Sequence, residues 1–271
     1  MLRDTHDAIL EEGILRFLGK TYNKFHFYIH DSVSSTNDAA KEMVRSGGAP
    51  GSVIVANTQS SGRGRNGRTF SSPEGGIYAS FIFAEEQIPY IRQFLSFAPC
   101  IAACAVMERL LGVRPSVKWP NDILLNGGKV CGILSETLMG TDISGIIIGI
   151  GVNLSTELES LPEEIRLTAS TLKQYANNLS RNEFIAGLVR ELDNIRASFT
   201  KEQYLSEYKK RLTTLGNEII VISRRGEILA KALDVTEDGG LLIEKTDGVV
   251  EKIYEGDISI RNSARQRRKS P

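Results

Sequence analysis

The chain contains few cysteines and no excess charge of either sign. Its three cysteines, Cys100, Cys104 and Cys131, are an odd number without CxxC spacing. This argues against a disulfide framework or a thiolate zinc site and favours buried thiols in a reducing compartment. Lysine plus arginine and aspartate plus glutamate both number 33, so the formal net charge is zero. We therefore expect no surface-wide nucleic-acid footprint, and positive charge only at local sites.

The sequence also lacks the marks of secretion and of membrane insertion. No stretch near the amino terminus combines basic residues with an apolar core. We expect no apolar run of the roughly twenty residues that span a bilayer, and the apolar run at 143–152 is too short. The sequence therefore predicts a soluble, cytoplasmic protein without a membrane partner.

At 271 residues the chain exceeds one typical domain, which predicts one large domain and a small second one. Apolar residues at helical spacing predict a long core helix at 90–111 and two helices within 181–212, with a break near Phe199. Short alternating runs within 218–261, separated by glycine-containing turns, predict a small β-barrel. The predicted units are an amino-terminal helical extension (1–24), an α/β body (25–214), the barrel (215–262) and a disordered basic tail (263–271).

The most distinctive segment is a cationic loop at residues 58–76. Here Arg63, Arg65 and Arg68 alternate with glycines, directly after an apolar run at 52–56 that predicts a buried strand. Glycine permits close backbone approach, and each guanidinium offers planar donors to carboxylate or phosphate oxygens. The loop predicts an anion-binding site that orders when an anion neutralises it. The alternatives are a solvated turn or an RNA-binding Gly/Arg tract.

A polar segment joins a predicted strand at 25–30 to a predicted helix at 38–45. It contains Ser35, Thr36 and Asn37. One of these side chains either caps the helix or presents a hydroxyl to a small polar ligand, which a helix amino terminus also attracts with its backbone donors.

Two charged residues and two glycines mark a further candidate site. Asp122 follows a predicted strand and is either a turn aspartate or a Mg²⁺ ligand beside phosphates. Lys129 follows a Gly-Gly turn and is either a solvated edge residue or faces the same cavity as Asp122. Gly149 and Gly151 lie within the run at 143–152, which predicts a central strand that a ligand or another backbone approaches closely.

Taken together, these motifs resemble those of biotin protein ligases. The resemblance covers residues 25–262, in the family's order and spacing. It implies an α+β fold, with a class II synthetase-like mixed β-sheet, flanking helices and a small C-terminal SH3-like β-barrel. The matching segments are 35–37, Gln59, 62–68, 118–122, 128–134 and 149–153.

The resemblance implies an ATP-dependent ligase that acts in two steps. The biotin carboxylate attacks the α-phosphate of ATP to give biotinyl-5'-AMP and pyrophosphate, and a lysine of a biotin carboxyl carrier protein domain then takes the biotin. ATP and Mg²⁺ would be the cofactors, and homodimers occur in the family. The alternatives are a lipoate-protein ligase of the same fold, for which we expect a more apolar slot, and an RNA-binding module.

The resemblance also implies the site residues. Lys129 would bridge the biotin carboxylate and the α-phosphate, and Arg63 and Arg65 would hold carboxylate and phosphate oxygens. The implied catalytic residues are Lys129, Arg65 and Asp122, with Asp122 also the metal ligand. The implied biotin-binding residues are Ser35, Thr36, Asn37, Gln59, Arg63, Gly64, Arg65, Lys129 and Gly132. The implied nucleotide-binding residues are Arg65, Arg68, Phe70, Lys118, Asn121, Lys129, Asn153 and Arg261.

The chain departs from the family pattern in two places. Phe70 stands where the best-known bifunctional members have a tryptophan near the adenine, so stacking is altered. About two dozen residues precede the body, too few for the winged helix-turn-helix with which bifunctional members bind DNA. We therefore expect a ligase that does not bind DNA.

Overall fold

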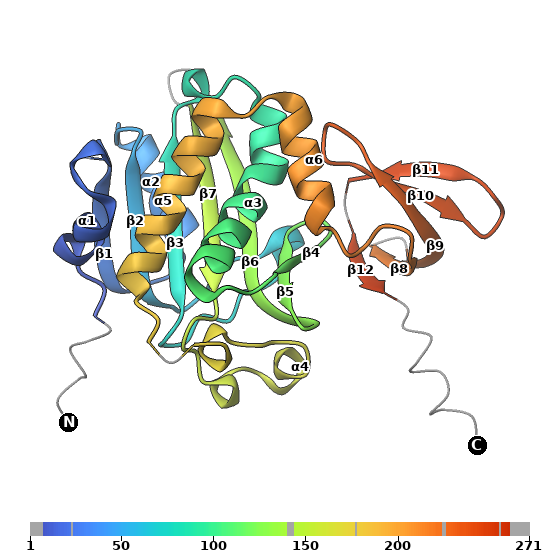
Figure 1. Ribbon diagram of the computed structural model, residues 1–271, viewed down its shortest axis with the longest axis horizontal. Coiled ribbons are helices and arrows are strands. Elements are labelled where there is room, and N and C mark those ends of the chain that lie inside the picture. Colours follow the sequence, from blue (N-terminus) through green and yellow to red (C-terminus); the bar gives the residue numbers. More distant parts are fainter. Residues whose placement is uncertain are drawn as a thin grey trace.

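The computed structural model describes residues 8–22, 24–139, 144–176, 178–223, 226–254 and 256–260. Within them, a large mixed sheet with flanking helices adjoins a smaller antiparallel sheet near the carboxy terminus (Figure 1). The large sheet has seven strands in the order β1-β2-β3-β7-β6-β5-β4. β1 and β2 pair in parallel, whereas the other neighbours are antiparallel. The predicted mixed α+β fold is thus confirmed.

The elements of the body follow one another along the chain. Its strands are β1 (His26–Val33), β2 (Ser52–Gln59), β3 (Ile77–Phe83), β4 (Ser116–Lys118), β5 (Asp122–Leu125), β6 (Gly128–Met139) and β7 (Ser144–Val152). Its α-helices are α1 (Glu11–Leu18), α2 (Thr36–Arg45), α3 (Ile91–Leu111), α4 (Glu163–Arg166), α5 (Arg181–Ser198) and α6 (Lys201–Arg211).

Different helices cover the two faces of the large sheet. Ile54 of β2 and Ile147 of β7 pack with α2, while their neighbours along each strand join the larger core that includes α3 and α5. Successive side chains of a strand point to opposite faces. Gly149 and Gly151, two and four residues after Ile147, therefore lie on the α2 face, where their missing side chains leave the sheet surface low.

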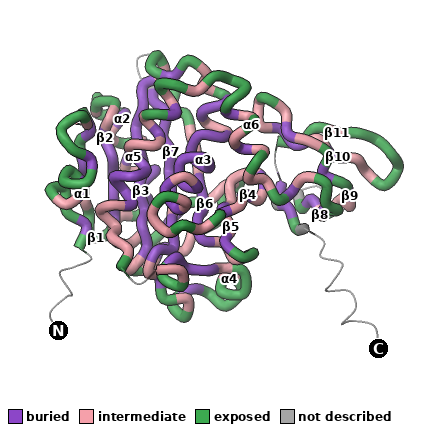
Figure 2. The backbone as a smooth tube through the Cα atoms, viewed as in Figure 1, coloured by how far each residue is buried: buried purple, intermediate pink, exposed green. Residues whose placement is uncertain are grey.

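α3 is the long core helix that periodicity predicts at 90–111. Its 21 residues are long and apolar enough to cross a membrane by length and composition, so the expectation that no apolar run reaches this length is wrong. However, 61% of its apolar window is buried in the protein. α3 packs against α5 and α6 and against the sheet, and Figure 2 shows it mostly buried. Its apolarity is accounted for by the core.

Capping residues set several helix boundaries. Ser35 is the N-cap of α2, and its hydroxyl accepts the backbone N–H of Asp38. The helix thus begins at Thr36, two residues before the predicted start. Thr200 and Gln203 form a reciprocal capping box at the start of α6. This confirms the predicted break between α5 and α6 near Phe199.

The smaller sheet contains the strands that alternation predicts within 218–261. In the order β11-β10-β9-β8-β12 they pair antiparallel throughout. Their bounds are β8 (Glu218–Ser223), β9 (Gly226–Val235), β10 (Leu241–Lys245), β11 (Val250–Ile253) and β12 (Asp257–Ile260). Ile219, Ala232 and Leu241 are buried in one cluster with the body's core. The small sheet is therefore packed onto the body.

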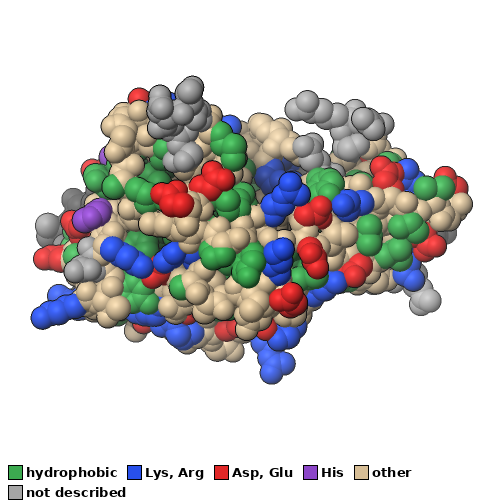
Figure 3. All heavy atoms as spheres, turned by 90° about the horizontal axis from the view of Figure 1, so that it is seen from above, with side chains coloured by type: hydrophobic (Ala, Val, Ile, Leu, Met, Phe, Trp, Pro, Cys, Tyr) green, Lys and Arg blue, Asp and Glu red, His purple; other side chains and the backbone are tan. Residues whose placement is uncertain are grey.

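The amino-terminal helix α1 packs on α5. In and just before this helix Ile9, Ile14 and Leu18 are buried, whereas Leu10 and Phe17 remain exposed. On the face seen from above, basic and acidic side chains are interspersed rather than separated (Figure 3). This view agrees with a balanced charge and gives no sign of a one-sign surface.

Candidate active site

A cavity of about 880 Å³ lies on the α2 face of the large sheet. Its walls come from the start of α2, the arginine loop, the β4–β5–β6 hairpins, the end of β7, the α4 region and β12. The cavity therefore spans the body and the small sheet. Predicted site residues that line it are Ser35, Thr36, Asn37, Gln59, Arg63, Gly64, Arg65, Arg68, Phe70, Lys118, Asn121, Asp122, Lys129, Gly132 and Asn153. Arg261 lies outside the described residues.

Glycines form the floor of this cavity. A Cβ atom on Gly132 would stand 2.8 Å from the Phe70 ring, and one on Gly151 would stand 2.5 Å from it. A Cβ on Gly149 would stand 2.1 Å from Asn37 Oδ1. The close approach predicted at Gly149 and Gly151 is thus confirmed, but the approaching groups are the side chains of Asn37 and Phe70 and not the expected ligand or backbone. Phe70 also meets the ring of Tyr78 edge-on, with centroids 6.3 Å apart.

One end of the cavity is uncharged and held by hydrogen bonds. Gln59 Oε1 accepts the Thr36 backbone N–H at 2.8 Å and lies 3.2 Å from Thr36 Oγ1. Gln59 Nε2 donates to Ser72 Oγ at 2.7 Å. Ser80 Oγ lies 2.8 Å from Thr36 Oγ1 and 2.6 Å from Asn37 Oδ1. Such a network offers fixed donors and acceptors to a neutral polar group.

Asn37 lines the cavity, but its side-chain amide is hydrogen-bonded to other residues of the protein. Its Nδ2 donates to Leu134 O at 3.2 Å and to Glu136 Oε2 at 2.8 Å, while Oδ1 takes the contact from Ser80. Its two donors and its acceptor are therefore all engaged. Asn37 therefore connects α2 to β6, and its predicted contact with biotin stays a prediction.

Glu136 extends this connection to the arginine loop. Its carboxylate lies 2.7 Å from Lys41 Nζ and 3.7 Å from Arg63 Nη2. Arg63 also pairs through Nη1 with Asp38 in the first turn of α2. The guanidinium of Arg63 thus ties the loop to α2. Sequence reasoning did not identify Glu136.

The opposite end of the cavity is cationic. Lys129 Nζ lies 2.6 Å from Asp122 Oδ1, and Lys118 Nζ lies 3.5 Å from Asp122 Oδ2. Two ammonium groups against one carboxylate leave one net positive charge. Lys129 Nζ also stands 5.8 Å from the centroid of the Phe70 ring, between the two ends. The prediction that Asp122 and Lys129 face one cavity is confirmed.

Two asparagines that are predicted to bind the nucleotide, Asn121 and Asn153, donate hydrogen bonds to backbone carbonyls. Asn153, which is 6% exposed, donates through Nδ2 to Lys129 O at 3.4 Å and to Ser170 O at 3.2 Å. Asn121 Nδ2 donates to Ile133 O. Through these bonds both asparagines support β6, the strand that carries Lys129 and Gly132.

The arginine loop is a short hydrogen-bonded hairpin. Phe70 N donates to Gly62 O at 2.8 Å and Gly64 N to Arg68 O at 2.7 Å. Asn66 at its tip has a φ of 55°, in the left-handed region that asparagine tolerates. The loop is therefore held by hydrogen bonds of its own, which the prediction of a loop ordered by an anion did not include. The further prediction that an anion tightens it stays open to test.

Arg65 reaches the small sheet. Its Nη2 donates to the carbonyl of Tyr254 at 3.0 Å, and its guanidinium lies 6.0 Å from the ring centroid of Trp119. Nothing in the local sequence around Arg65 points to residue 254. Cavity-lining residues that sequence reasoning missed also include Tyr78, Thr168, Ala169, Ile258 and Ser259.

The three cysteines are free and buried, as predicted. Burial raises the pKa of the Cys104 thiol to about 12, and it also raises the pKa of the Cys100 and Cys131 thiols. Thiols that stay protonated are poor nucleophiles and poor metal ligands. Among the described residues no group of three or more His, Cys, Asp or Glu side chains is placed to hold a metal ion.

Comparison with known proteins agrees with this geometry. Residues 29–153 match the biotin/lipoate A/B protein ligase family, and residues 214–261 match the biotin protein ligase C-terminal domain. The bifunctional ligase/repressor BirA of Bacillus subtilis is 32% identical over 260 residues, which cover 93% of this chain and 79% of that protein. The biotin–(acetyl-CoA-carboxylase) ligase of Mycobacterium tuberculosis is 29% identical over 77% of this chain and 78% of its own length.

A solved structure is also similar. The biotin protein ligase of Aquifex aeolicus in complex with biotin and ATP superposes with a TM-score of 0.71 at 28% identity, covering 88% of this chain and 99% of that one. The sequence match to BirA, the two family matches in order and the shared fold all agree. The chain belongs to the biotin/lipoate A/B protein ligase family, among its biotin protein ligases.

Proposed function

We propose that this chain activates biotin with ATP and transfers the biotin to a lysine of a carrier domain. The observation that carries the proposal is one cavity with an uncharged hydrogen-bonding end and a cationic end, in a chain of this family. The Aquifex relative binds biotin and ATP. A lipoate-protein ligase is less well supported, because the Mycobacterium and Aquifex relatives are named for biotin.

The cationic end suits the first step. The biotin carboxylate and the α-phosphate of ATP are both anions, and they must approach within bonding distance. The net positive charge of Lys118, Asp122 and Lys129 would offset that repulsion. A carboxylate oxygen attacks phosphorus, the bond to the pyrophosphate oxygen breaks, and pyrophosphate leaves with its electron pair. We assign Lys129 the bridging position between the two anions.

The uncharged end suits the biotin head group. The ureido ring of biotin is neutral and carries both donors and acceptors, which need partners once buried. Ser35, Thr36 and Gln59 surround this end, and the bonds of Gln59 to Thr36 and Ser72 fix the amide orientation. We assign these three side chains to the ureido ring and Asn37 to the support beneath them.

The second step needs an activated acid shielded from water. The carrier lysine attacks the carbonyl carbon of biotinyl-5'-AMP as a neutral amine, the bond to the phosphate oxygen breaks, and AMP leaves while the amine proton passes to solvent. The hairpin that carries Arg63 and Arg65 lines the cavity. We propose that its guanidinium groups hold the phosphate and retain the intermediate.

The sequence predicted a magnesium ion on Asp122, and the residues do not fit a protein-held ion. Asp122 is engaged by two ammonium groups, which repel a cation. The other carboxylate among the cavity-lining residues is Glu164. We propose that magnesium arrives on the phosphates of ATP, which supply the oxygens that the protein lacks. Asp122 then serves to hold Lys129.

The remaining assignments concern organisation and partners. We propose 25–214 as the catalytic domain and 215–262 as the C-terminal domain, with Arg261 a nucleotide-side residue. A biotin carboxyl carrier domain is the proposed acceptor. A homodimer, a cytoplasmic location and the absence of DNA binding stay predictions from the sequence.

The deciding experiment incubates the purified chain with ATP, magnesium, biotin and a carrier domain, and measures the mass of the carrier. The expected result is the mass increase of one biotin, with pyrophosphate released only when biotin is present. Lipoate in place of biotin tests the same-fold alternative. Salt-sensitive RNA binding without biotin-dependent pyrophosphate would instead favour the RNA-binding alternative.

A further inference from the structure

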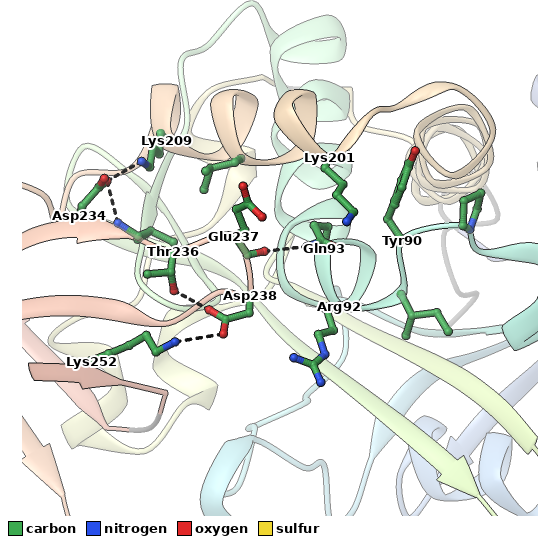
Figure 4. A pocket seen from close by; sticks show the side chains of 14 residues that line it. Tyr90, Arg92, Gln93, Lys201, Lys209, Asp234, Thr236, Glu237, Asp238 and Lys252 are labelled. Atoms are coloured by element: carbon green, nitrogen blue, oxygen red, sulfur yellow. Dashed lines mark hydrogen bonds and ion pairs between the residues drawn. The ribbon is translucent and has the colours of Figure 1, made fainter.

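The turn between β9 and β10, residues 236–240, is fastened to the body. Gln93 of α3 donates through Nε2 to Glu237 O at 3.1 Å, and Trp119 donates through Nε1 to Gly239 O at 3.0 Å. Gly239 has a φ of +88°, and a Cβ there would stand 2.6 Å from Ser96 Oγ. The turn therefore needs glycine and sits in close contact with α3. Figure 4 shows this junction and the bond from Gln93 to Glu237.

Asp238 in this turn binds side chains at the end of β11 and directly after it. Its Oδ2 accepts the hydroxyl of Tyr254 at 2.6 Å and lies 3.3 Å from Lys252 Nζ, while Oδ1 accepts Thr236 Oγ1 (Figure 4 for the Thr236 and Lys252 bonds). These donors hold the pKa of Asp238 well below its usual value, with the Thr236 hydroxyl the largest cause. The carboxylate is thus charged at neutral pH and is a strong acceptor.

Tyr254 connects this carboxylate to the arginine loop. The side chain of Tyr254 is bonded to Asp238, and its backbone carbonyl accepts Arg65 Nη2 at 3.0 Å. Tyr254 is 47% exposed. Its placement therefore depends on directed hydrogen bonds more than on burial.

The same turn reaches Arg65 by a second route. Trp119 is 1% exposed, and its indole N–H is fixed by the Gly239 carbonyl. Its ring faces the Arg65 guanidinium at 6.0 Å. One turn of the small sheet thus sets both the carbonyl and the aromatic ring that contact Arg65.

We propose that Asp238 and Tyr254 are positioning residues that hold Arg65 over the cavity, so that the small sheet governs how long the activated acid is retained. The part of this inference that concerns retention of the activated acid rests on the proposed function. Its structural part, that the Tyr254 hydroxyl immobilises the Arg65 segment, stands without any substrate.

The test compares wild type with Tyr254→Phe, which removes one hydroxyl and keeps the ring and the backbone carbonyl. Tyr28→Phe is the matched control, because Tyr28 is 43% exposed and lies on β1, outside the cavity lining. Without substrates, trypsin should cut after Arg65 about fivefold faster in Tyr254→Phe than in wild type or the control, since an exposed segment without its anchor opens more often. Peptide masses identify the cut.

With biotin, ATP and magnesium, Tyr254→Phe should release free biotinyl-5'-AMP about fivefold faster, while the initial rate of pyrophosphate release changes less than twofold. Arg65→Ala supplies the second arm. If Tyr254 acts through Arg65, adding Tyr254→Phe to Arg65→Ala should change release less than about 1.5-fold, because the two changes remove the same contact. Asp238→Asn, which keeps the shape and removes the charge, should act in the same direction.

Unchanged trypsin cleavage in Tyr254→Phe would overturn the inference, and so would effects on release that multiply in the double variant. A wild-type chain that releases no pyrophosphate with biotin would instead overturn the proposed function. The trypsin comparison would still decide the structural part in that case. Thermal melting of each variant separates loss of the anchor from loss of the fold.

Discussion

Replacing Ser80 by alanine tests whether the hydrogen bonds beneath the cavity hold its uncharged end in shape. Ser80 is fully buried, and its Oγ lies 2.6 Å from Asn37 Oδ1 and 2.8 Å from Thr36 Oγ1. Alanine removes the donor to Asn37 and leaves a buried acceptor unpaired. The space of one oxygen is too small to hold a replacement water with several partners.

The expected cost follows from the chemistry. A buried acceptor without a partner costs about 1–3 kcal/mol, so about 2 kcal/mol is the working value. If this cost only lowered the free energy of unfolding, Tm would drop by about 4–8 °C for a protein of this size. Because Thr36 takes part in the same network and lines the end of the cavity that we propose binds biotin, we expect roughly half to appear as weaker biotin binding, about fivefold in Kd.

Calorimetric titration with biotin and thermal melting measure the two parts. Ser135→Ala is the matched control, since Ser135 is a strand serine bonded to Leu95 O at 3.0 Å and lies outside the cavity lining. It should lower Tm slightly and leave biotin affinity unchanged. A Ser80→Ala variant that melts earlier but binds biotin as tightly as wild type would refute the positioning role of this network.

Four further results are expected. Lys129→Ala should abolish biotin-dependent pyrophosphate release without lowering Tm by more than a few degrees, because the side chain is about one-third exposed; near-normal release would remove Lys129 from the reaction. Arg65→Ala should still form biotinyl-5'-AMP but lose it to solution, which chromatography of the filtrate detects; adenylate that stays enzyme-bound would contradict this. Gly151→Ala should displace Phe70, since the new Cβ would stand 2.5 Å from the ring, and should raise the KM for ATP about tenfold or more; an unchanged KM would show that Phe70 does not border the nucleotide. Finally, the raised pKa of Cys104 means that only the unfolded thiol ionises between about pH 9 and 12, so Cys104 alone should lower the free energy of unfolding there by about 1.4 kcal/mol per pH unit. Cys104→Ala should remove this share of the fall in urea titrations at pH 8 to 10, and an unchanged pH dependence would contradict it.

Local sequence signals predicted the elements that depend on neighbouring residues. The core helix at 90–111, the break between α5 and α6 and the short strands after residue 218 all follow from spacing and turn chemistry. The close approach at Gly149 and Gly151 was also predictable, since two glycines in an apolar strand leave space for something. What fills that space, Asn37 and Phe70, comes from distant segments.

The rest of the site depends on the order of the strands in the sheet and on which face of the sheet each side chain occupies. Ser80 and Glu136 meet Asn37 because β3 and β6 flank β7 and because both side chains lie on the sheet face that α2, which carries Asn37, covers. One signal did exist for Ser80, which is the lone serine in a strand whose seven residues are all buried. A polar residue in such a place needs a partner. Glu136 carried no comparable signal.

Asn37 and Asn153 show a different limit. An amide in a polar motif can contact a ligand or bind nearby carbonyls, and the motif is the same in both cases. Here the amides donate to Leu134 O, Lys129 O and Ser170 O. Their replacement should therefore act through the position of neighbouring groups rather than through a lost ligand contact.

The arginine hairpin shows why the two ends of the cavity act together. Arg63 is tied to α2 through Asp38, whereas Arg65 is tied to the small sheet through Tyr254 O. Two residues of extended chain span only about 7 Å, so these anchors lie close along a short, hydrogen-bonded segment. A shift at either anchor must reach Gly64 between them, whose N–H is bonded to Arg68 O at 2.7 Å. The hairpin therefore couples the hydrogen-bonded end near α2 to the small sheet, and a loosened small sheet should release the activated acid while biotin itself still binds.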